Sequence, residues 1–200
     1  MSRCRETGAA WVQTDSNHID PTGDSTTVAM TEADWFAQVE DAGDQSGYFE
    51  PLGDNHFALF SDESTTLLVT FESVETIRAE DPASLPLGHR IAAEKGWSSL
   101  TLISRGQTWF RDRAIYRFFD RLVDDAFFED FDRVVFFGAG ICGYAAAAYS
   151  VAAPGARVLA VQPRASLDPE IAGWDPRHRG QRRLSFTDRD HEWNGVDETG

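Results

Sequence analysis

One short segment, VVFFGAGICGYAAAAYS at residues 134–150, constrains the fold of this chain more than any other. Residues that favour β-strands run into a glycine-rich turn, and an alanine-rich stretch typical of a helix follows at once. A strand that turns directly into a helix is the building unit of parallel α/β sheets. Ligands of such sheets gather where strand carboxyl ends meet helix N-termini, so we expect any functional site at this turn.

The remaining pattern predicts an α/β fold with a doubly wound, mostly parallel sheet, because strands and helices alternate along the chain. A helix is expected to begin at Thr31, which can cap it, and to end at Gly43. In the helix predicted over residues 112–127, apolar residues recur every three or four positions. One strand is predicted just before a turn at 53–55. Further strands are predicted at 56–60, 67–71, 97–104, 134–137 and 157–161. Further helices are predicted at 87–95, 112–127 and 141–153.

Length and composition favour one domain. The chain has 200 residues, of which 42% are hydrophobic, enough for a single core. Residues 1–29 and 188–200 are polar and lack periodicity, so we expect both segments to be disordered. The folded domain is predicted to span residues 30–187.

Charge and cysteine content narrow the classes of partner. A net charge of −15 repels nucleic acids and anionic lipids, and no apolar run approaches the ~20 residues that span a bilayer. Cys4 and Cys142 have neither the spacing of a metal site nor that of a disulfide framework, which favours a reducing cytoplasm. We therefore expect no nucleic-acid, membrane or metal partner. A small molecule remains possible, and the oligomeric state is left open.

The turn has two functional interpretations, a phosphate-binding loop and a nucleophile elbow, and one structural interpretation. The glycines match the G-x-G-x-x-G loop of dinucleotide-binding folds, which predicts NAD(P) or FAD as cofactor. That loop expects an acidic residue about 20 positions on for the ribose hydroxyls, where the chain has Gln162, although Arg164 could meet a 2′-phosphate. Structurally, the glycines can simply let strand and helix pack closely. Either functional interpretation gives the same candidate ligand-binding residues: Gly138, Ala139, Gly140, Ile141, Gly143 and Tyr144.

Residues 136–177 resemble a group of bacterial α/β-hydrolase-like proteins whose nucleophile elbow reads G-x-S-x-G-G-Y-A-A, followed by a strand, Ser-Pro-Gln, Leu-Asp-Pro and Trp-Asp. Here Pro163, Leu167-Asp168-Pro169 and Trp174-Asp175 fall in that order, and the resemblance extends over residues 95–185. Some of these proteins carry the name phosphoadenosine phosphosulfate reductase, which adds adenylyl sulfate to the candidate ligands. The resemblance implies an α/β-hydrolase-like sheet, and we expect it to be truncated at its C-terminal edge.

On that pattern Gly140 occupies the position of the nucleophile. Glycine has no atom that can attack a carbonyl, so the resemblance implies a degenerate or non-catalytic hydrolase relative. Cys142 is the candidate catalytic residue, since a thiol in the first turn of a helix can have a lowered pKa, but a buried structural cysteine is the commoner case. His178 is a poor candidate for the base. Whether the chain is an enzyme stays open.

The oxyanion hole of such hydrolases uses the amide after the nucleophile, here that of Ile141, with one from a loop after an earlier strand, here near Glu72 and Ser73. These donors can persist as an anion pocket. Glu72 itself is interpreted as an exposed strand-end carboxylate, Trp109 and Phe110 as core residues, and the basic stretch 177–183 as a solvated loop.

Three functions are therefore carried forward. The leading one is a non-catalytic hydrolase-like protein with a small-ligand or anion pocket at residues 138–144, and the alternative is a nucleotide-binding protein. A second alternative is a structural or interaction module whose unfinished sheet edge pairs with a partner. A strained apex at Gly140 would favour the elbow, and a wider loop with converging amides would favour a phosphate cradle.

Overall fold

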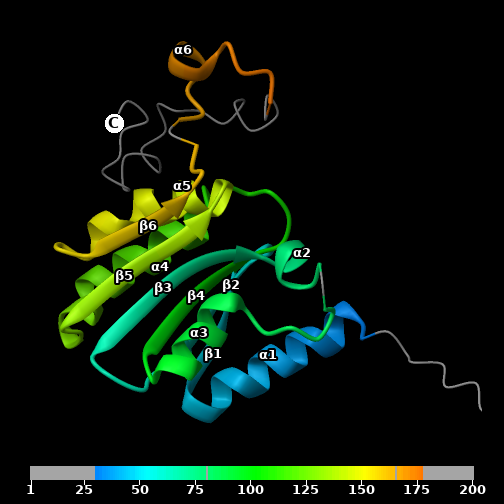
Figure 1. Ribbon diagram of the computed structural model, residues 1–200, viewed down its shortest axis with the longest axis vertical. Coiled ribbons are helices and arrows are strands. Elements are labelled where there is room, and N and C mark those ends of the chain that lie inside the picture. The colour runs from blue at the N-terminus through cyan, green and yellow to red at the C-terminus, as the bar shows by residue number, and fades with distance from the viewer. Residues whose placement is uncertain (1–29, 80, 165, 178–200) are drawn as a thin grey trace, which may run out of the picture.

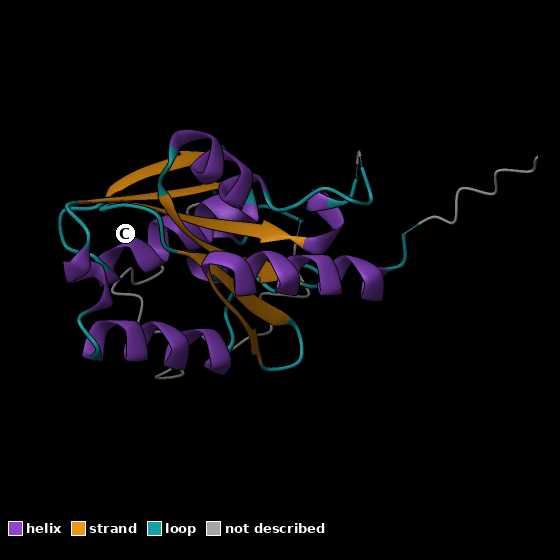
Figure 2. Ribbon diagram, turned by 90° about the horizontal axis from the view of Figure 1, so that it is seen from below, coloured by secondary structure: helices purple, strands orange, loops and turns teal. Residues whose placement is uncertain are grey.

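The computed structural model describes residues 30–79, 81–164 and 166–177, which form a sheet of six strands with helices on both faces (Figures 1 and 2). The strand order is β1-β2-β4-β3-β5-β6. β2 is antiparallel to both of its neighbours, and β4, β3, β5 and β6 are mutually parallel. The predicted α/β class and mostly parallel sheet are confirmed. The strands are β1 (Gly47–Leu52), β2 (His56–Ser61), β3 (Thr66–Ser73), β4 (Ser98–Ser104), β5 (Arg133–Ala139) and β6 (Arg157–Val161).

Helices α1 (Glu32–Ser46) and α3 (Leu87–Lys95) cover one face of the sheet, and α4 (Arg113–Asp124) and α5 (Ile141–Tyr149) cover the other. Two short helices, α2 (Val74–Ile77) and α6 (Pro169–Ala172), and two 3-10 turns, η1 (Phe127–Asp130) and η2 (Ser150–Ala152), complete the described elements. No helix of the described ranges combines the length and the apolar character needed to cross a bilayer.

The larger core lies beneath α4 and α5. The ring of Phe71 on β3 packs against Phe110, Phe119 and Tyr149 at centroid distances of 5.0, 6.1 and 5.6 Å. The hydroxyl of Tyr149 donates to the carbonyl oxygen of Phe110 at 2.6 Å, so this buried polar atom is satisfied. Aromatic packing of this kind fixes α4 and α5 against the sheet.

Helix α1 begins as predicted but ends later. Thr31 forms a capping box with Asp34, each side chain bonding the other's backbone. The prediction that Gly43 ends the helix is wrong, because α1 continues to Ser46. A Cβ atom at Gly43 would lie 2.8 Å from the amide nitrogen of Phe49, so this glycine allows close approach to β1 rather than ending the helix.

Two other predicted helices are too long at their C-terminal ends. The helix predicted over 112–127 ends at Asp124, because Ala126 adopts a left-handed conformation with φ 54° that breaks the α-helical run. The helix predicted over 141–153 ends at Tyr149 and continues as η2. The predicted disordered segments 1–29 and 188–200 lie outside the described residues, as do His178 and all of the basic stretch except Arg177.

Candidate functional site

The chain passes from β5 to α5 through a single residue, Gly140. Its backbone angles of φ 59° and ψ −121° lie in a region that side chains rarely tolerate. The Gly140 N–H donates to the carbonyl of Val161 on β6 at 2.9 Å, and its carbonyl accepts from the amide of Tyr144 at 3.2 Å. The strained apex is thus fixed both to the neighbouring strand and to the helix that it starts.

The three glycines of the turn have different structural roles. A Cβ at Gly138 would overlap the carbonyl group of Cys142, and one at Gly143 would lie 3.1 Å from the Gly138 oxygen and 3.3 Å from the Cβ of Pro163. Close packing of α5 on β5 therefore accounts for Gly138 and Gly143. A Cβ at Gly140 would meet no atom within 4 Å, so a side chain there would stand in open space.

Amide donors and a second loop border this open space. The first amides of α5, from Ile141 onward, have no partner within the helix, and the positive end of the helix dipole lies there. Ser73 ends β3, and Ala139, the residue before Gly140, ends the neighbouring parallel strand β5. Ser73 is the N-cap of α2, its Oγ accepting from the amide of Thr76 at 3.2 Å. The loop after β3 thus begins next to the turn.

A cavity of about 430 Å³ adjoins the turn on the α3 side of the sheet. This volume is within the range of small-ligand pockets. Arg90 is exposed at the cavity and forms no ion pair with another described residue. The apolar lining is Phe71, Ile77, Ala79, Leu85, Leu87, Phe137 and Ala139, and the polar lining is Glu72, Ser73, Thr76, Ser84, Arg90 and Cys142.

The carboxylate of Glu72 hydrogen-bonds to the backbone at the start of α3. Its carboxylate accepts the amide hydrogens of Leu87 at 2.7 Å and Gly88 at 2.8 Å, and also the hydroxyl of Thr70 at 3.1 Å. Burial raises the pKa of Glu72, and the two amide hydrogen bonds oppose that rise. The interpretation of Glu72 as an exposed strand-end carboxylate is therefore wrong: it is partly buried and fixes the start of α3 at the cavity.

Cys142 lines the cavity from the first turn of α5. Burial, with the nearby charge of Glu72, raises the pKa of the Cys142 thiol to about 12. The sulfur is therefore protonated at neutral pH. The two described histidines hydrogen-bond elsewhere, His56 with the hydroxyl of Thr108 and His89 with that of Ser61. Within the part of the chain that the structure describes, the candidate catalytic thiol lacks a histidine base.

Tyr144 belongs to a small cluster above the start of α5. Its ring packs edge-on against Trp109 at 5.3 Å, and Leu167 and Ile141 join them. Trp109 and Phe110 are buried, as expected, but both have left-handed backbones, with φ 59° and 57°. Nothing in the local sequence signals this conformation, because neither residue is Gly, Asn or Asp.

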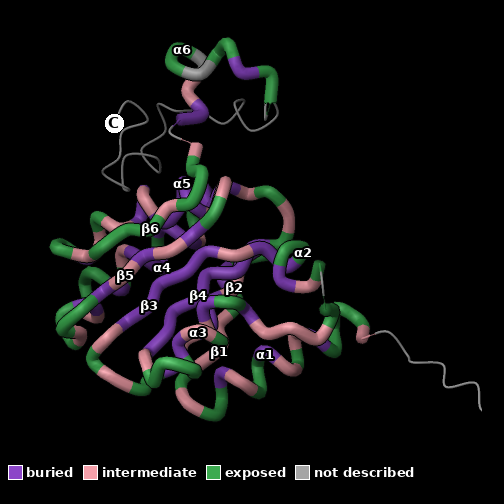
Figure 3. Tube along the Cα trace, in the orientation of Figure 1, coloured by how far each residue is buried: buried purple, intermediate pink, exposed green. Residues whose placement is uncertain are grey.

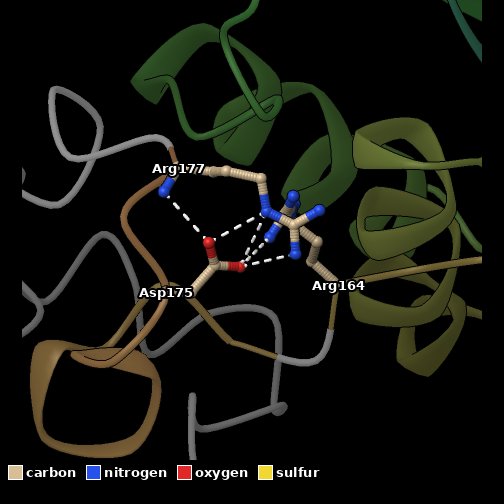
Figure 4. Close-up of polar contacts among 3 residues, drawn as sticks. All are labelled: Arg164, Asp175 and Arg177. Carbon is tan, nitrogen blue, oxygen red and sulfur yellow. Dashed lines mark hydrogen bonds and ion pairs between the residues drawn. The ribbon is translucent and has the colours of Figure 1, made fainter.

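The segment after β6 is held by charges that the sequence analysis missed. Asp175 is buried, and its Oδ2 lies 2.6 Å from an Arg164 guanidinium nitrogen and 2.8 Å from one of Arg177 (Figure 4). Hydrogen bonds from Arg177, and then from Arg164, lower the pKa of Asp175. Arg164, considered above for a 2′-phosphate, thus already has a carboxylate partner.

The described residues contain no group of three or more His, Cys, Asp or Glu side chains placed to hold a metal ion. The chain shows no significant match to any protein-family model, curated protein or solved structure. The resemblance to α/β-hydrolase-like proteins therefore stays a prediction.

Proposed function

We propose that this protein is a non-catalytic α/β-hydrolase-like protein that binds a small ligand at the turn 138–144. The observation that carries the proposal is the geometry of Gly140, a strained apex between strand and helix with open space where a side chain would stand. In α/β-hydrolases a serine nucleophile occupies such an apex. Here the apex has no side chain, so nucleophilic attack from this position is impossible.

Donors for an anion remain around the apex. In α/β-hydrolases the oxyanion hole combines the amide after the nucleophile with one from the loop that follows the third strand. Ile141 holds the first position, and the loop that begins at Ser73 holds the second. Two such donors without an attacking oxygen favour binding of an anion over turnover.

The adjoining cavity suggests the chemistry of the ligand. Seven of its thirteen lining residues are apolar, and Arg90 supplies an exposed cation that forms no salt bridge with a described carboxylate, although its charge opposes the rise in the pKa of Glu72. A small acid with an apolar body and one carboxylate fits both features. Octanoate is a suitable probe, and octanol, which has the same chain without the charge, is its matched control.

Calorimetric titration tests this proposal. We expect octanoate to bind and octanol not to bind. Arg90→Gln should weaken octanoate binding about tenfold, whereas Arg117→Gln, which removes an exposed arginine from α4, should not change it. Absence of octanoate binding, or equal losses in the two variants, would count against the ligand site.

The non-catalytic part needs a separate assay. We expect the purified protein not to hydrolyse p-nitrophenyl butyrate. Ester hydrolysis that persists through purification and disappears in a folded Gly140→Val variant would overturn this part of the proposal. Hydrolysis that is lost instead in Cys142→Ser would restore the thiol as the catalytic residue.

The alternative of a nucleotide-binding protein has weaker support at the same turn. The amide of Gly140, which a phosphate cradle would need, donates to Val161, and Arg164 pairs with Asp175. Titration with NAD(P), FAD and adenylyl sulfate, followed through the fluorescence of the six tryptophans, distinguishes the two functions. Saturable quenching by any of these ligands would favour the nucleotide site.

A further inference from the structure

Exposed large hydrophobic side chains gather on one side of the molecule. Of the eight such residues in the described ranges, three lie on β6, two line a hollow together with Arg157 at the start of β6, two follow β6 along the chain, and Leu87 is the exception. Figure 3 shows the same contrast between the exposed β6 and the buried β3 and β4. The other seven are Val123, Val151, Val158, Leu159, Val161, Ile171 and Trp174.

β6 is an edge strand that exposes apolar side chains on both faces of the sheet. Val158 is 43% exposed and pairs with Phe136, so it lies on the α5 face, whereas Leu159, 57% exposed, pairs with Phe137 on the opposite face. A helix would pack on only one of these rows, whereas an added strand would place its own side chains beside both. Residues 157–161 contain no Lys, Glu or Pro, and their one charged side chain, Arg157, stands at the start of the strand, so the centre of the edge lacks the residues that commonly block strand addition.

The backbone groups of β6 that face away from β5 pair with no other strand of the described residues, and they define a register for the added strand. The carbonyl of Val161 bonds Gly140 on the β5 side, so alternation places the backbone groups of Val158 and Ala160 on the open edge. These two residues are symmetric about Leu159. An antiparallel second β6 centred on Leu159 would pair each Val158 with the other copy's Ala160, satisfying all of these groups at once.

Two further features lie at opposite ends of β6. A hollow of about 680 Å³, here called the groove, precedes the strand and includes Val123, Val151 and Arg157 in its lining. Residues 166–177, here called the arm, follow the strand, and α6 stands beyond the carboxyl edge of the sheet (Figure 1). The arm carries Trp174, which is 81% exposed. Because they lie at opposite ends of β6, the arm of one copy does not lie at its own groove.

We propose that β6 is the interface of a twofold homodimer, in which two copies of this chain pair antiparallel through β6. Antiparallel pairing places the end of one β6 beside the start of the other, which brings the arm of each copy to the groove of its partner. A twofold axis normal to the sheet also keeps the α5 faces of the two copies on the same side. One arrangement thus covers the edge, the groove and the arm, and it is independent of any ligand at Gly140.

Cysteine cross-linking tests the register. Residues that face each other across a non-hydrogen-bonded antiparallel pair have Cα atoms about 4.5 Å apart, within the range of a disulfide. In a Cys4→Ser background, Leu159→Cys should therefore form a disulfide-linked dimer under mild oxidation. Leu87→Cys, an exposed site outside the interface, and Val161→Cys, which would face Arg157 of the other copy, should not. Failure of Leu159→Cys to cross-link faster than either control would overturn the proposal.

Sedimentation equilibrium tests the dimer without a cross-link. The wild-type chain should be dimeric, and Leu159→Lys should be monomeric because two ammonium groups would meet across the axis. Leu87→Lys, the same change at a control site, should remain dimeric. Trp174→Ala should raise the dimer dissociation constant about tenfold, and circular dichroism should show every variant folded. A wild-type monomer at all concentrations, or equal behaviour of the two lysine variants, would contradict the interface.

Discussion

The two ends of the sheet differ in how their surfaces are covered. At the β1–β4 end, α1 packs its fully buried Trp35 and Val39 against Leu59 and Ile103, and the indole N–H of Trp35 donates to the Ser84 carbonyl at 2.7 Å. At the β6 end, Leu159 is more than half exposed, and the described residues place no helix over it. The β1–β4 end is therefore closed by the packing of α1, whereas the candidate ligand turn and the proposed interface both lie at the β6 end, where apolar side chains are left exposed.

The largest expected effect on the free energy of unfolding compares one side chain from each end of the sheet. Trp35→Ala should lower the free energy of unfolding by about 4 kcal/mol, because it leaves a cavity and removes the donor to Ser84. Leu159→Ala should change it by less than about 0.5 kcal/mol in dilute, monomeric protein. Urea denaturation measures both values. Similar losses in the two variants would show that the β6 end is as tightly packed as the other.

A second pair of variants compares two glycines of the same turn. Gly138→Ala should lower the free energy of unfolding by about 3 kcal/mol, since its Cβ would overlap the Cys142 carbonyl. Gly140→Ala should lower it by only about 1 kcal/mol, because the new methyl group meets no atom and only the positive φ is unfavourable. Thermal unfolding of both variants checks the order. A reversed order would mean that residue 140 is not an open apex.

Acid should lower the free energy of unfolding through two histidines at the β1–β4 end. Burial lowers the pKa of His56, against an opposing charge from Asp112, and burial also lowers the pKa of His89. The folded chain therefore binds protons less readily than the unfolded chain. The contribution of the two neutral histidines to the free energy of unfolding is complete above pH 6.5 and is lost as the pH falls below that value. Each histidine contributes a slope of at most about 1.4 kcal/mol per pH unit.

Urea denaturation between about pH 7 and pH 5.5 measures this slope. The double variant His56→Gln/His89→Gln should flatten it, and each single variant should flatten it partly. A double variant with the wild-type slope would show that other groups control the response to acid.

The smallest effect concerns the start of α1. Thr31→Ala should lower the free energy of unfolding by about 1 kcal/mol, because it removes the side-chain acceptor for the amide of Asp34. Thr65→Ala is the control, since Thr65 is exposed and its side chain forms no hydrogen bond with another described residue. Chemical denaturation should separate the two variants, and equal values would mean that the cap adds nothing to the covered end.

Features that depend on local periodicity could be predicted from the sequence. The strand at 157–161 has the predicted bounds, and the helix over 87–95 ends at Gly96 as expected. Gly140 adopts the strained apex that the elbow hypothesis requires. In each case the information lies in residues close together along the chain.

The errors come from contacts between different elements, which the periodicity of one element does not encode. A glycine at position 43 resembles a helix end in the local pattern, which does not contain its close contact with Phe49 on β1. The local pattern predicts an exposed Glu72 because it does not contain the partners of this carboxylate, which lie at the start of α3. The contact between Arg164 and Asp175 was missed for the same reason. At the candidate site, the positions of the residues could be predicted, but the cavity that adjoins them could not.

The position of β3 in the sheet has a consequence for how the nascent chain folds. β1 and β2 form a hairpin that can close as soon as both leave the ribosome, whereas the partners of β3, β4 and β5, are synthesised later. β3 cannot be flanked on both sides until residues 74–132 have also emerged. Its apolar Leu67–Leu68–Val69 run is therefore without its final neighbours for much of translation, and we expect a chaperone to contact the growing polypeptide there.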